Sequence, residues 1–370
     1  MKIAIIGTRG IPANYGGFET FAEECAAGLV DRGHTVTVYG RSHYVSRTLK
    51  THRGAQLVVL PTLKWKYTDT VIHTFLSILH ALGRRYDLIL ICNAANSIYA
   101  WIPRICGIPV VVNVDGIERL RQKWNLLGKA YYRLCEYLST LFPNAIVSDA
   151  QVIKKYYQDR YGAASVYIPY GTAIARPEGT EFLEKLGVIP ERYFLYVSRL
   201  EPENNAHRVV EAFERVKSSK RLIVVGDAPY AEEYIQRVRA SRDPRILFPG
   251  AIYGEGYRQL QAYAFCYIHA TEVGGAHPAL IEAMGQGSLI IANDTPENAE
   301  VLGNAGLLYP KNQVESLAHY LQEVEDDPDK YAGFRAAALE RARSVYSWDA
   351  VINRYEQLFL NLAGRSNSSQ

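Results

Sequence analysis

The sequence lacks a long apolar run. No stretch approaches the roughly 18–20 consecutive apolar residues that a membrane-spanning helix requires. The apolar run from Met1 to Ile6 is also far too short for a secretory signal, and we interpret it as a strand. We therefore expect a cytoplasmic protein, and leave open a peripheral contact at the inner face of the membrane.

Cysteine patterns typical of metal and redox sites are absent too. The five cysteines are Cys25, Cys92, Cys106, Cys135 and Cys266. They show neither CxxC nor Cys/His spacing, so no zinc site is indicated. Their apolar neighbours predict reduced side chains in the protein core. No Asp-x-Asp pair stands at a predicted ligand-binding position, so we expect no obligatory metal and no other cofactor.

The first glycine-rich loop lacks the spacing of a dinucleotide-binding fingerprint. Gly7-Thr8-Arg9-Gly10 is not G-x-G-x-x-G, and the next strand ends in Gly40-Arg41 where that motif has an acidic residue. This argues against a dehydrogenase. Gly16 and Gly17 still precede a predicted helix, where free N–H groups attract a phosphate. A plain strand-to-helix turn fits the same residues.

What the sequence does contain is a double series of alternating strand and helix patterns. With 370 residues the chain is long enough for two domains. The alternation predicts α/β architecture with parallel sheets, in two doubly wound Rossmann-like domains facing across a ligand cleft at the carboxyl ends of their strands. We place the N-terminal domain at residues 1–172 plus 347–370, and the second domain at 173–346.

Charge is divided unevenly between these halves. Residues 1–172 carry 20 Lys and Arg against 11 Asp and Glu, whereas the remainder carries 21 against 27. A basic half suits anionic lipid, a phosphorylated acceptor or nucleic acid. One segment is both basic and aromatic, with Arg119, Arg121, Lys123, Trp124, Lys129, Tyr131, Tyr132 and Arg133. Membrane docking, RNA contact and a solvated helix all fit it, but no nucleic-acid motif accompanies it, so no nucleic-acid partner is expected.

The stretch from Cys266 to Gly287 predicts a buried strand, a turn and a helix that begins near Pro278. Gly274 and Gly275 leave amide groups at the helix start, which attract anions. Glu272 and Glu282 lie on either side of this turn, and carboxylates accept hydrogen bonds from sugar hydroxyls. The combination fits a nucleotide sugar. An ordinary strand–turn–helix with solvated glutamates fits as well.

Two more charged residues follow predicted strands. Arg199 can grip a diphosphate bidentately and stays protonated, although a salt bridge to Glu201 or Glu203 is the simpler role. Asp115 could orient a sugar hydroxyl or take a proton from an acceptor, or could cap the following segment.

The ordered set of motifs resembles retaining glycosyltransferases of family 4, which have the GT-B fold. It consists of TRGIPANYGGFET, VDGIE, IPYG, SRLEPENNAHRVVEAF, VVGDAP, GGAHPALIEAMGQGSLIIAND and the terminal SW helix. The first motif and PENN are most like a bacterial subgroup that includes rhamnosyltransferases of capsule and cell-wall polysaccharide assembly. The resemblance covers nearly the whole chain.

This resemblance implies roles for the residues at the matching positions. It implies that Arg199 binds the donor diphosphate, that Glu282 binds the ribose and that Glu272 contacts the sugar. The loop at Gly16 and Gly17 would meet the diphosphate, and further donor contacts would come from Asn204, Gly274, Gly275, Ala276 and His277. The last helix, from Trp348 to Leu362, would return to the first domain.

The chain departs from the family pattern at two places. Asn204 stands where the family commonly has a lysine, and Glu272 and Glu282 are ten positions apart where eight is usual. The first departure leaves one phosphate charge without its usual partner, and the second makes the role of Glu272 less secure than that of Glu282. The resemblance leaves the identity of any catalytic base open, with Asp115 as the candidate here.

The resemblance implies a glycosyltransferase that takes its sugar, with rhamnose as one candidate, from a dTDP-, UDP- or GDP-linked donor. The implied acceptor is a saccharide linked to polyprenyl diphosphate. Two alternatives are a nucleotide-sugar epimerase of the same architecture and a non-catalytic sugar-binding protein.

Overall fold

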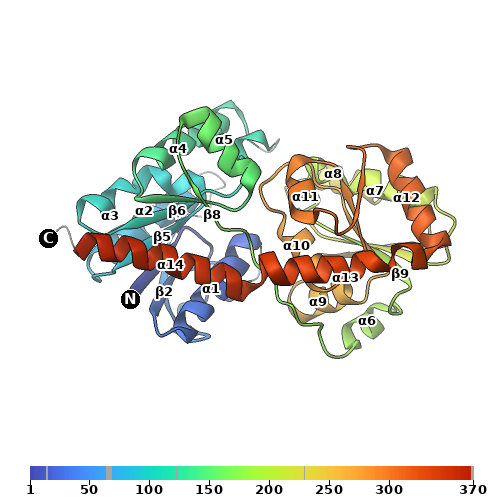
Figure 1. The fold of residues 1–370 in the computed structure, drawn as a ribbon, viewed down its shortest axis with the longest axis horizontal. Helices are drawn as coiled ribbons and strands as arrows, with labels where there is room; N and C mark the ends of the chain where they lie inside the picture. The colour runs from blue at the N-terminus through green and yellow to red at the C-terminus, as the bar shows by residue number, and fades with distance from the viewer. Residues whose placement is uncertain (14–15, 64–68, 122–123, 229, 368–370) are drawn as a thin grey trace. The chain divides into compact units, whose positions relative to one another are not determined.

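The computed structural model describes residues 1–13, 16–63, 69–121, 124–228 and 230–367 (Figure 1). Asn14 and Tyr15 of the first motif, and Lys123 of the basic segment, lie outside the described residues. The contacts divide the chain into two compact units. Unit 1 comprises residues 1–170 and 348–370, and unit 2 comprises residues 171–347.

The core of unit 1 is a sheet of apolar strands. Its order is β3-β4-β2-β1-β5-β6-β7-β8, parallel throughout except for β3 beside β4. The central strands read KIAII and LILIC and are almost wholly buried, as expected where helices cover both faces. The strands are β1 Lys2–Ile6, β2 Thr35–Arg41, β3 Thr51–His52, β4 Ala55–Leu60, β5 Leu88–Cys92, β6 Val110–Asn113, β7 Ala145–Ser148 and β8 Val166–Tyr167.

Helices connect these strands and cover the sheet. They are α1 Gly17–Asp31, α2 Asp69–Leu82, α3 Trp101–Ile105, α4 Leu126–Leu141, α5 Gln151–Tyr161 and α14 Trp348–Asn367, with 3-10 turns η1 Ala94–Tyr99 and η2 Glu118–Leu120.

The last helix, α14, belongs to unit 1 and lies along α1 (Figure 1). Tyr355 packs its ring 5.1 Å from that of Phe21 and receives a hydrogen bond of 2.8 Å from Asn113. A Cβ at Gly28 would lie 2.3 Å from Ile352, so glycine at that position permits the close approach of the two helices.

Unit 2 repeats the architecture with a smaller, wholly parallel sheet. Its order is β11-β10-β9-β12-β13-β14, so β9 and β12 are neighbours although they are far apart in sequence. The strands are β9 Tyr193–Val197, β10 Arg221–Val225, β11 Ile246–Gly250, β12 Cys266–His269, β13 Ile290–Asn293 and β14 Leu307–Tyr309.

The helices of unit 2 are α6 Glu181–Leu186, α7 Ala206–Glu214, α8 Glu232–Val238, α9 Gly254–Ala262, α10 Pro278–Gly285, α11 Pro296–Leu302, α12 Val314–Asp326 and α13 Ala332–Arg341. Short turns complete the unit, namely η3 Pro202–Asn204, η4 Pro328–Tyr331 and the π-helical η5 Ala342–Tyr346. Two sheets of mainly parallel strands, covered by helices, confirm the predicted α/β class.

Residues 94–105 form two pieces, because the 3-10 turn η1 closes at Ala100 with a bond to Ser97 before α3 begins. One local prediction was wrong. Cys106 is exposed and not in the core, since it forms the C-terminal cap of the short helix α3. The other four cysteines are buried as expected.

Candidate functional site

The candidate site of unit 2 lies where neighbouring parallel strands end. Arg199 follows β9 by two residues and Glu272 follows β12 by three. The Glu272 amide donates to the carbonyl of Glu203 at 3.1 Å, which ties the two loops together. Because β9 and β12 are adjacent, residues about seventy positions apart in sequence meet at one edge of the sheet.

Arg199 is the cationic member of this edge. Its side chain is 37% exposed, and Nη2 lies 3.7 Å from a carboxylate oxygen of Glu201. Glu201 itself is buried and accepts a hydrogen bond of 2.6 Å from Tyr230. The ion pair therefore orients the guanidinium, while the exposed part of the side chain can still receive a bidentate anion.

Asn204, for which the family resemblance implies a donor contact, bonds to the loop that contains it. It is buried, and its side-chain amide donates to the Arg199 carbonyl at 2.6 Å. The Tyr196 hydroxyl donates to the carbonyl of Asn204. Asn204 therefore fixes the loop that carries Arg199, and a direct contact with a donor remains an expectation.

A set of carboxamides holds Glu272 in place. Asn312 donates through Nδ2 to the Glu272 carboxylate, and its Oδ1 accepts from Asn205 at 3.1 Å and from Asn293 at 2.9 Å. Asn205 and Asn293 are buried, and both also donate to the Ala270 carbonyl, at 3.0 and 3.2 Å. Hydrogen bonds of these side-chain amides thus connect four loops at the sheet edge, and they orient the Glu272 carboxylate.

The sequence analysis did not identify these amides. Asn205, Asn293 and Asn312 are spread over more than a hundred residues and share no spacing. The one signal is that each follows a predicted strand or the loop after it. Asn312 also has a φ of 61°, a left-handed conformation that asparagine tolerates better than most residues.

The turn after β12 leads into α10, with His277 as its cap and Pro278 in its first turn, as predicted. A Cβ at Gly274 would lie 2.5 Å from the His277 ring, so glycine there lets the buried imidazole pack against the loop. The His277 ring centre is 5.0 Å from that of buried His269. Burial lowers the pKa of His269, and His277 lowers it further.

Gly275 and Ala276 lie in the same turn, directly before α10, and both are buried. The start of an eight-residue helix adds its partial positive charge at this point. Backbone amides at such a start suit an oxyanion.

Glu282 projects from α10 between the buried positions of that helix. It accepts a hydrogen bond of 2.5 Å from Tyr257 of α9, which in turn accepts one of 2.7 Å from Gln261. Gln261 also donates to the Ala279 carbonyl at 3.1 Å. Tyr257 and Gln261 are further residues that the sequence analysis missed, and they hold Glu282 in one orientation.

The glycine-rich loop of unit 1 is organised differently. Gly16 caps α1 with extended backbone, and Gly17 begins the helix. The amide of Arg9 donates to Glu19 at 2.9 Å and that of Ala13 to Glu23 at 2.6 Å, so carboxylates of α1 bind two of the loop amides. Burial raises the pKa of Glu19.

Asp115 lies just beyond β6, at the carboxyl edge of the first sheet. It has a φ of 56°, and its amide donates to the Asn113 side chain at 3.1 Å. Burial, and next the Glu118 carboxylate, raise the pKa of Asp115. A carboxyl group with a raised pKa can exchange a proton nearer to neutral pH, which suits acid–base chemistry.

Two other features of the described residues bear on function. No group of three or more His, Cys, Asp or Glu side chains is placed to hold a metal ion within the ranges that the structure describes. None of the helices in those ranges is long and apolar enough to cross a bilayer.

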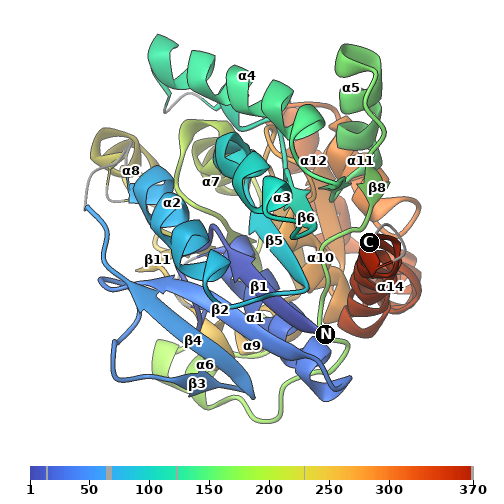
Figure 2. The ribbon, with the colours of Figure 1, turned by 90° about the vertical axis from the view of Figure 1, so that its left-hand side faces the viewer.

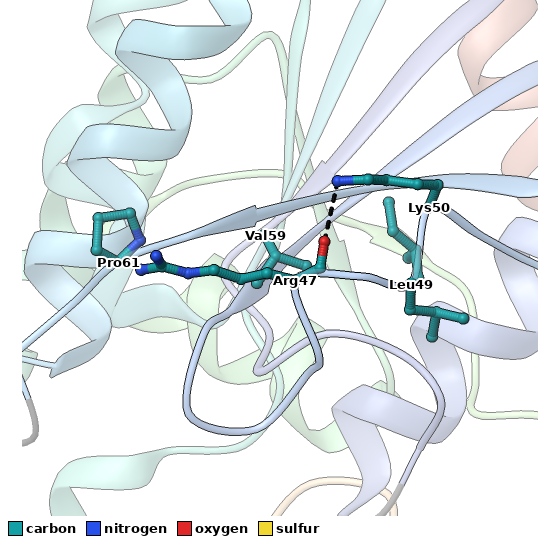
Figure 3. A pocket seen from close by; sticks show the side chains of 6 residues that line it. Arg47, Leu49, Lys50, Val59 and Pro61 are labelled. Carbon is teal, nitrogen blue, oxygen red and sulfur yellow. Dashed lines mark hydrogen bonds between the residues drawn. The ribbon is translucent and has the colours of Figure 1, made fainter.

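A separate pocket of about 320 Å³ lies in unit 1 and is lined by Arg47, Leu49, Lys50, Leu57, Val59 and Pro61 (Figure 3). Lys50 donates to the Arg47 carbonyl at 2.9 Å across it. The pocket includes none of the candidate site residues.

The two halves of the chain match different family models. Residues 15–176 match the model "Glycosyltransferase Family 4", and residues 181–341 match "Glycosyl transferases group 1".

Among curated proteins, the O-antigen chain mannosyltransferase B of Escherichia coli is 26% identical over 210 residues, which is 54% of each chain. The exopolysaccharide phosphotransferase SCO2592 of Streptomyces coelicolor is 28% identical over 177 residues, or 45% of this chain and 18% of that protein. The matched part thus spans about half of the first relative and under a fifth of the second.

Solved structures match over nearly the whole chain. Sucrose-phosphate synthase from Thermosynechococcus elongatus superposes with a TM-score of 0.83, 18% identity and coverage of 98% and 99%. Anabaena HepE in complex with UDP and glucose superposes with a TM-score of 0.80 and 18% identity, over 98% of this chain and 100% of that one. One glycosyltransferase family model thus matches each half of the chain, and the solved structures show that the whole chain has the GT-B fold.

Proposed function

We propose that the protein transfers a hexose from a nucleoside diphosphate sugar to a saccharide hydroxyl, with retention of the anomeric configuration. The observation that carries this proposal is the grouping of Arg199, Glu272 and the start of α10 at one edge of the unit 2 sheet, with Glu282 on the same helix. A guanidinium and helix-start amides suit a diphosphate. The two carboxylates suit hydroxyl groups on either side of it.

The comparisons support a nucleotide-sugar donor. The HepE structures contain UDP with glucose in one case and UDP-glucose in another. The nucleoside diphosphate of the donor is UDP, dTDP or GDP, and rhamnose is the sugar that the family resemblance favours. The acceptor is a saccharide carried on polyprenyl diphosphate in cell-surface polysaccharide assembly, in keeping with the O-antigen relative.

The chemistry follows from how charge develops on the diphosphate. The acceptor oxygen attacks the anomeric carbon on the face from which the diphosphate oxygen departs, and that oxygen takes the acceptor proton. The bond from the anomeric carbon to the diphosphate breaks as the new glycosidic bond forms. Arg199 and the amides of residues 275–277 stabilise the charge that accumulates on the leaving group.

In this mechanism Glu272 orients the sugar and Glu282 the ribose. Asp115 is the candidate for orienting a donor-sugar hydroxyl, since the diphosphate oxygen takes the acceptor proton. No metal is required, because the cationic side chain and the helix start supply the positive charge.

The test is product analysis with the full chain. Each of the three nucleoside diphosphate sugars is incubated with a saccharide on a polyprenyl diphosphate analogue, and the linkage is read by NMR. The proposal expects release of nucleoside diphosphate and a product whose anomeric configuration equals that of the donor. An inverted product would disprove retention, and donor isomerisation without an acceptor would assign the chain to the epimerases.

A further inference from the structure

Helix α4 of unit 1 has two apolar faces, and only one of them is covered. The inward face, which includes Tyr132, Cys135 and Ser139, is buried. Tyr131 and Cys135 bond to the Ala95 carbonyl of η1, at 2.8 and 3.4 Å. These contacts fix which way the helix faces, so the residues on its other side point into solvent.

The outer α4 face consists of large apolar side chains. Leu126 is 85% exposed and Leu127 80%, while Leu134, Tyr137 and Leu141 are each almost half exposed. On a helix with 3.6 residues per turn these five positions share an arc of about 100°, on the side opposite the buried one. Figure 2 shows α4 at the outer surface of unit 1, along the top of the view. An isolated exposed leucine needs no explanation, but a continuous row of them along one helix does.

The charges beside this face are positive. Lys129 and Arg133 are exposed, and they lie on the edge of the arc, one helical turn apart. The one acidic residue of α4, Glu136, is buried and binds Arg119 on the inward side. The outer face of α4 therefore presents leucines and cations with no carboxylate of its own.

The neighbouring helix α3 also exposes large apolar side chains. Arg104 donates to the carbonyls of Leu141 and Phe142 at 2.9 and 3.0 Å, so α3 lies against the end of α4. One turn apart on α3, Ile105 is 72% exposed and Trp101 43%. Tryptophan and tyrosine beside leucine are typical of surfaces that enter the headgroup region of a bilayer.

We propose that the outer α4 face docks on the surface of an anionic lipid bilayer. Leu126, Leu127 and Leu134 enter the boundary between headgroups and acyl chains, and Lys129 and Arg133 bind lipid phosphates. The helix lies in the plane of the interface, as expected for a segment with an apolar arc beside a cationic edge. The excess of basic residues in positions 1–172 adds long-range attraction to the same surface.

The positive charge beside the outer α4 face favours an anionic bilayer over a second copy of the protein. Leucine is under-represented among the residues that dominate protein interfaces. A second copy of this chain would bring the same cations against Lys129 and Arg133, since a two-fold interface pairs a patch with itself. The docking does not depend on the proposed enzymatic activity, because lipid binding is measured without a substrate.

The experiment is flotation of the full chain with two kinds of vesicle, phosphatidylcholine alone and phosphatidylcholine with phosphatidylglycerol. We expect binding to the anionic vesicles that weakens as salt is raised. The triple variant Leu126→Ser, Leu127→Ser, Leu134→Ser should bind at least about tenfold more weakly, and Lys129→Glu with Arg133→Glu should also lose about tenfold. Ile189→Ser, at an exposed apolar residue of unit 2, is the matched control and should bind as wild type does.

Two outcomes would overturn the proposal. One is a wild-type protein that does not float with anionic vesicles. The other is a triple variant that retains wild-type flotation, with circular dichroism showing that it is folded. Analytical ultracentrifugation accompanies both, and a dimer that the triple variant converts to monomer while flotation is unchanged assigns the face to self-association instead.

Discussion

The carboxyl edges of the two sheets have the same architecture, but the carboxylates beside them have different partners. In unit 2 the loops after β9 and β12 carry a partly exposed arginine and lead into a helix start. In unit 1 the corresponding glycine-rich loop has two of its amides bound to Glu19 and Glu23. Asp115 follows strand β6 at the same edge. Both edges carry carboxyl groups, but in unit 1 two carboxylates bind amides of the loop, whereas in unit 2 Glu272 is bound by Asn312. The comparison teaches that the side chains around a strand-to-helix loop decide which of its amides are occupied; a contact of Gly16 and Gly17 with the diphosphate stays a prediction.

The largest expected effect is at Arg199. Replacing it with alanine removes the guanidinium that follows β9, and turnover should fall by ~10²-fold, the scale of losing one preorganised stabilising group. Steady-state kcat and KM with the accepted donor measure this. Arg215→Ala is the control, since that arginine directly follows α7, is exposed and pairs with Glu211 and Glu315. Near-wild-type turnover in Arg199→Ala would remove the basis of the comparison.

Glu282→Gln should have the next largest effect. Glutamine keeps the shape and can still accept from Tyr257, but hydrogen bonds from ribose to a neutral group are weaker, so nucleoside diphosphate affinity should drop about tenfold. Calorimetric titration checks this. The loss should also appear with the nucleoside alone, whereas Arg199→Ala should affect only phosphate-bearing ligands. Glu255→Gln, exposed on α9, should bind as wild type does. Equal affinities for Glu282→Gln and wild type would contradict the role.

Asn312→Asp isolates a single contact. Aspartate keeps the oxygen that accepts from Asn205 and Asn293 but loses the donor to Glu272, and places a second carboxylate beside it. A hydrogen bond to a charged group is worth about 1.5–3 kcal/mol, so kcat should fall roughly tenfold while nucleoside diphosphate affinity changes little. The control is Asn125→Asp, because aspartate caps α4 as well as asparagine does. A loss of affinity with unchanged kcat would show that the amides serve a different purpose.

The smallest effect concerns stability at Asp115. Its pKa is raised by burial and by Glu118, and Arg121 and a hydrogen bond with Asp149 oppose this. A raised folded pKa means that the group stabilises the protein below its unfolded pKa, near 4, and that this contribution is lost as pH rises through the folded value. At pH 8 the ionised group is therefore unfavourable, and Asp115→Asn should melt about 2 °C higher than wild type.

The dependence on pH separates this effect from others. The difference between wild type and Asp115→Asn should shrink as pH falls toward 4, whereas relief of the left-handed backbone would act equally at every pH. Thermal melts followed by circular dichroism from pH 4 to 8 give the measurement. A variant that melts lower than wild type at pH 8 would show that the ionised carboxylate is stabilising.

Local patterns predicted the architecture and the placement of the charged residues. Buried strands such as KIAII and the helix start at Pro278 follow from periodicity and from the conformational preference of proline, which act within a few residues. Arg199 and Glu272 were found because a strand end marks the edge of the sheet, and Glu282 because it lies one turn inside the helix that follows.

The remaining parts of the site depend on which loops the topology brings together. The bonds from Asn312 to Glu272 and from Tyr257 to Glu282 span 40 and 25 residues, and no local spacing encodes them. The family resemblance implies a donor contact for Asn204, which stays a prediction, whereas its burial and its bond to the Arg199 carbonyl are properties of the folded loop. Helix α5, Gln151–Tyr161, has few apolar residues, so its helical pattern in the sequence is weak.

Binding measurements on the unit 2 edge test the central claim most directly. Wild type and Arg199→Ala are titrated calorimetrically with UDP, dTDP and GDP and with the matching nucleosides. We predict that wild type binds at least one diphosphate more tightly than its nucleoside, and that Arg199→Ala loses this preference. A well-folded wild-type protein with no affinity for any of the three diphosphates would contradict the claim.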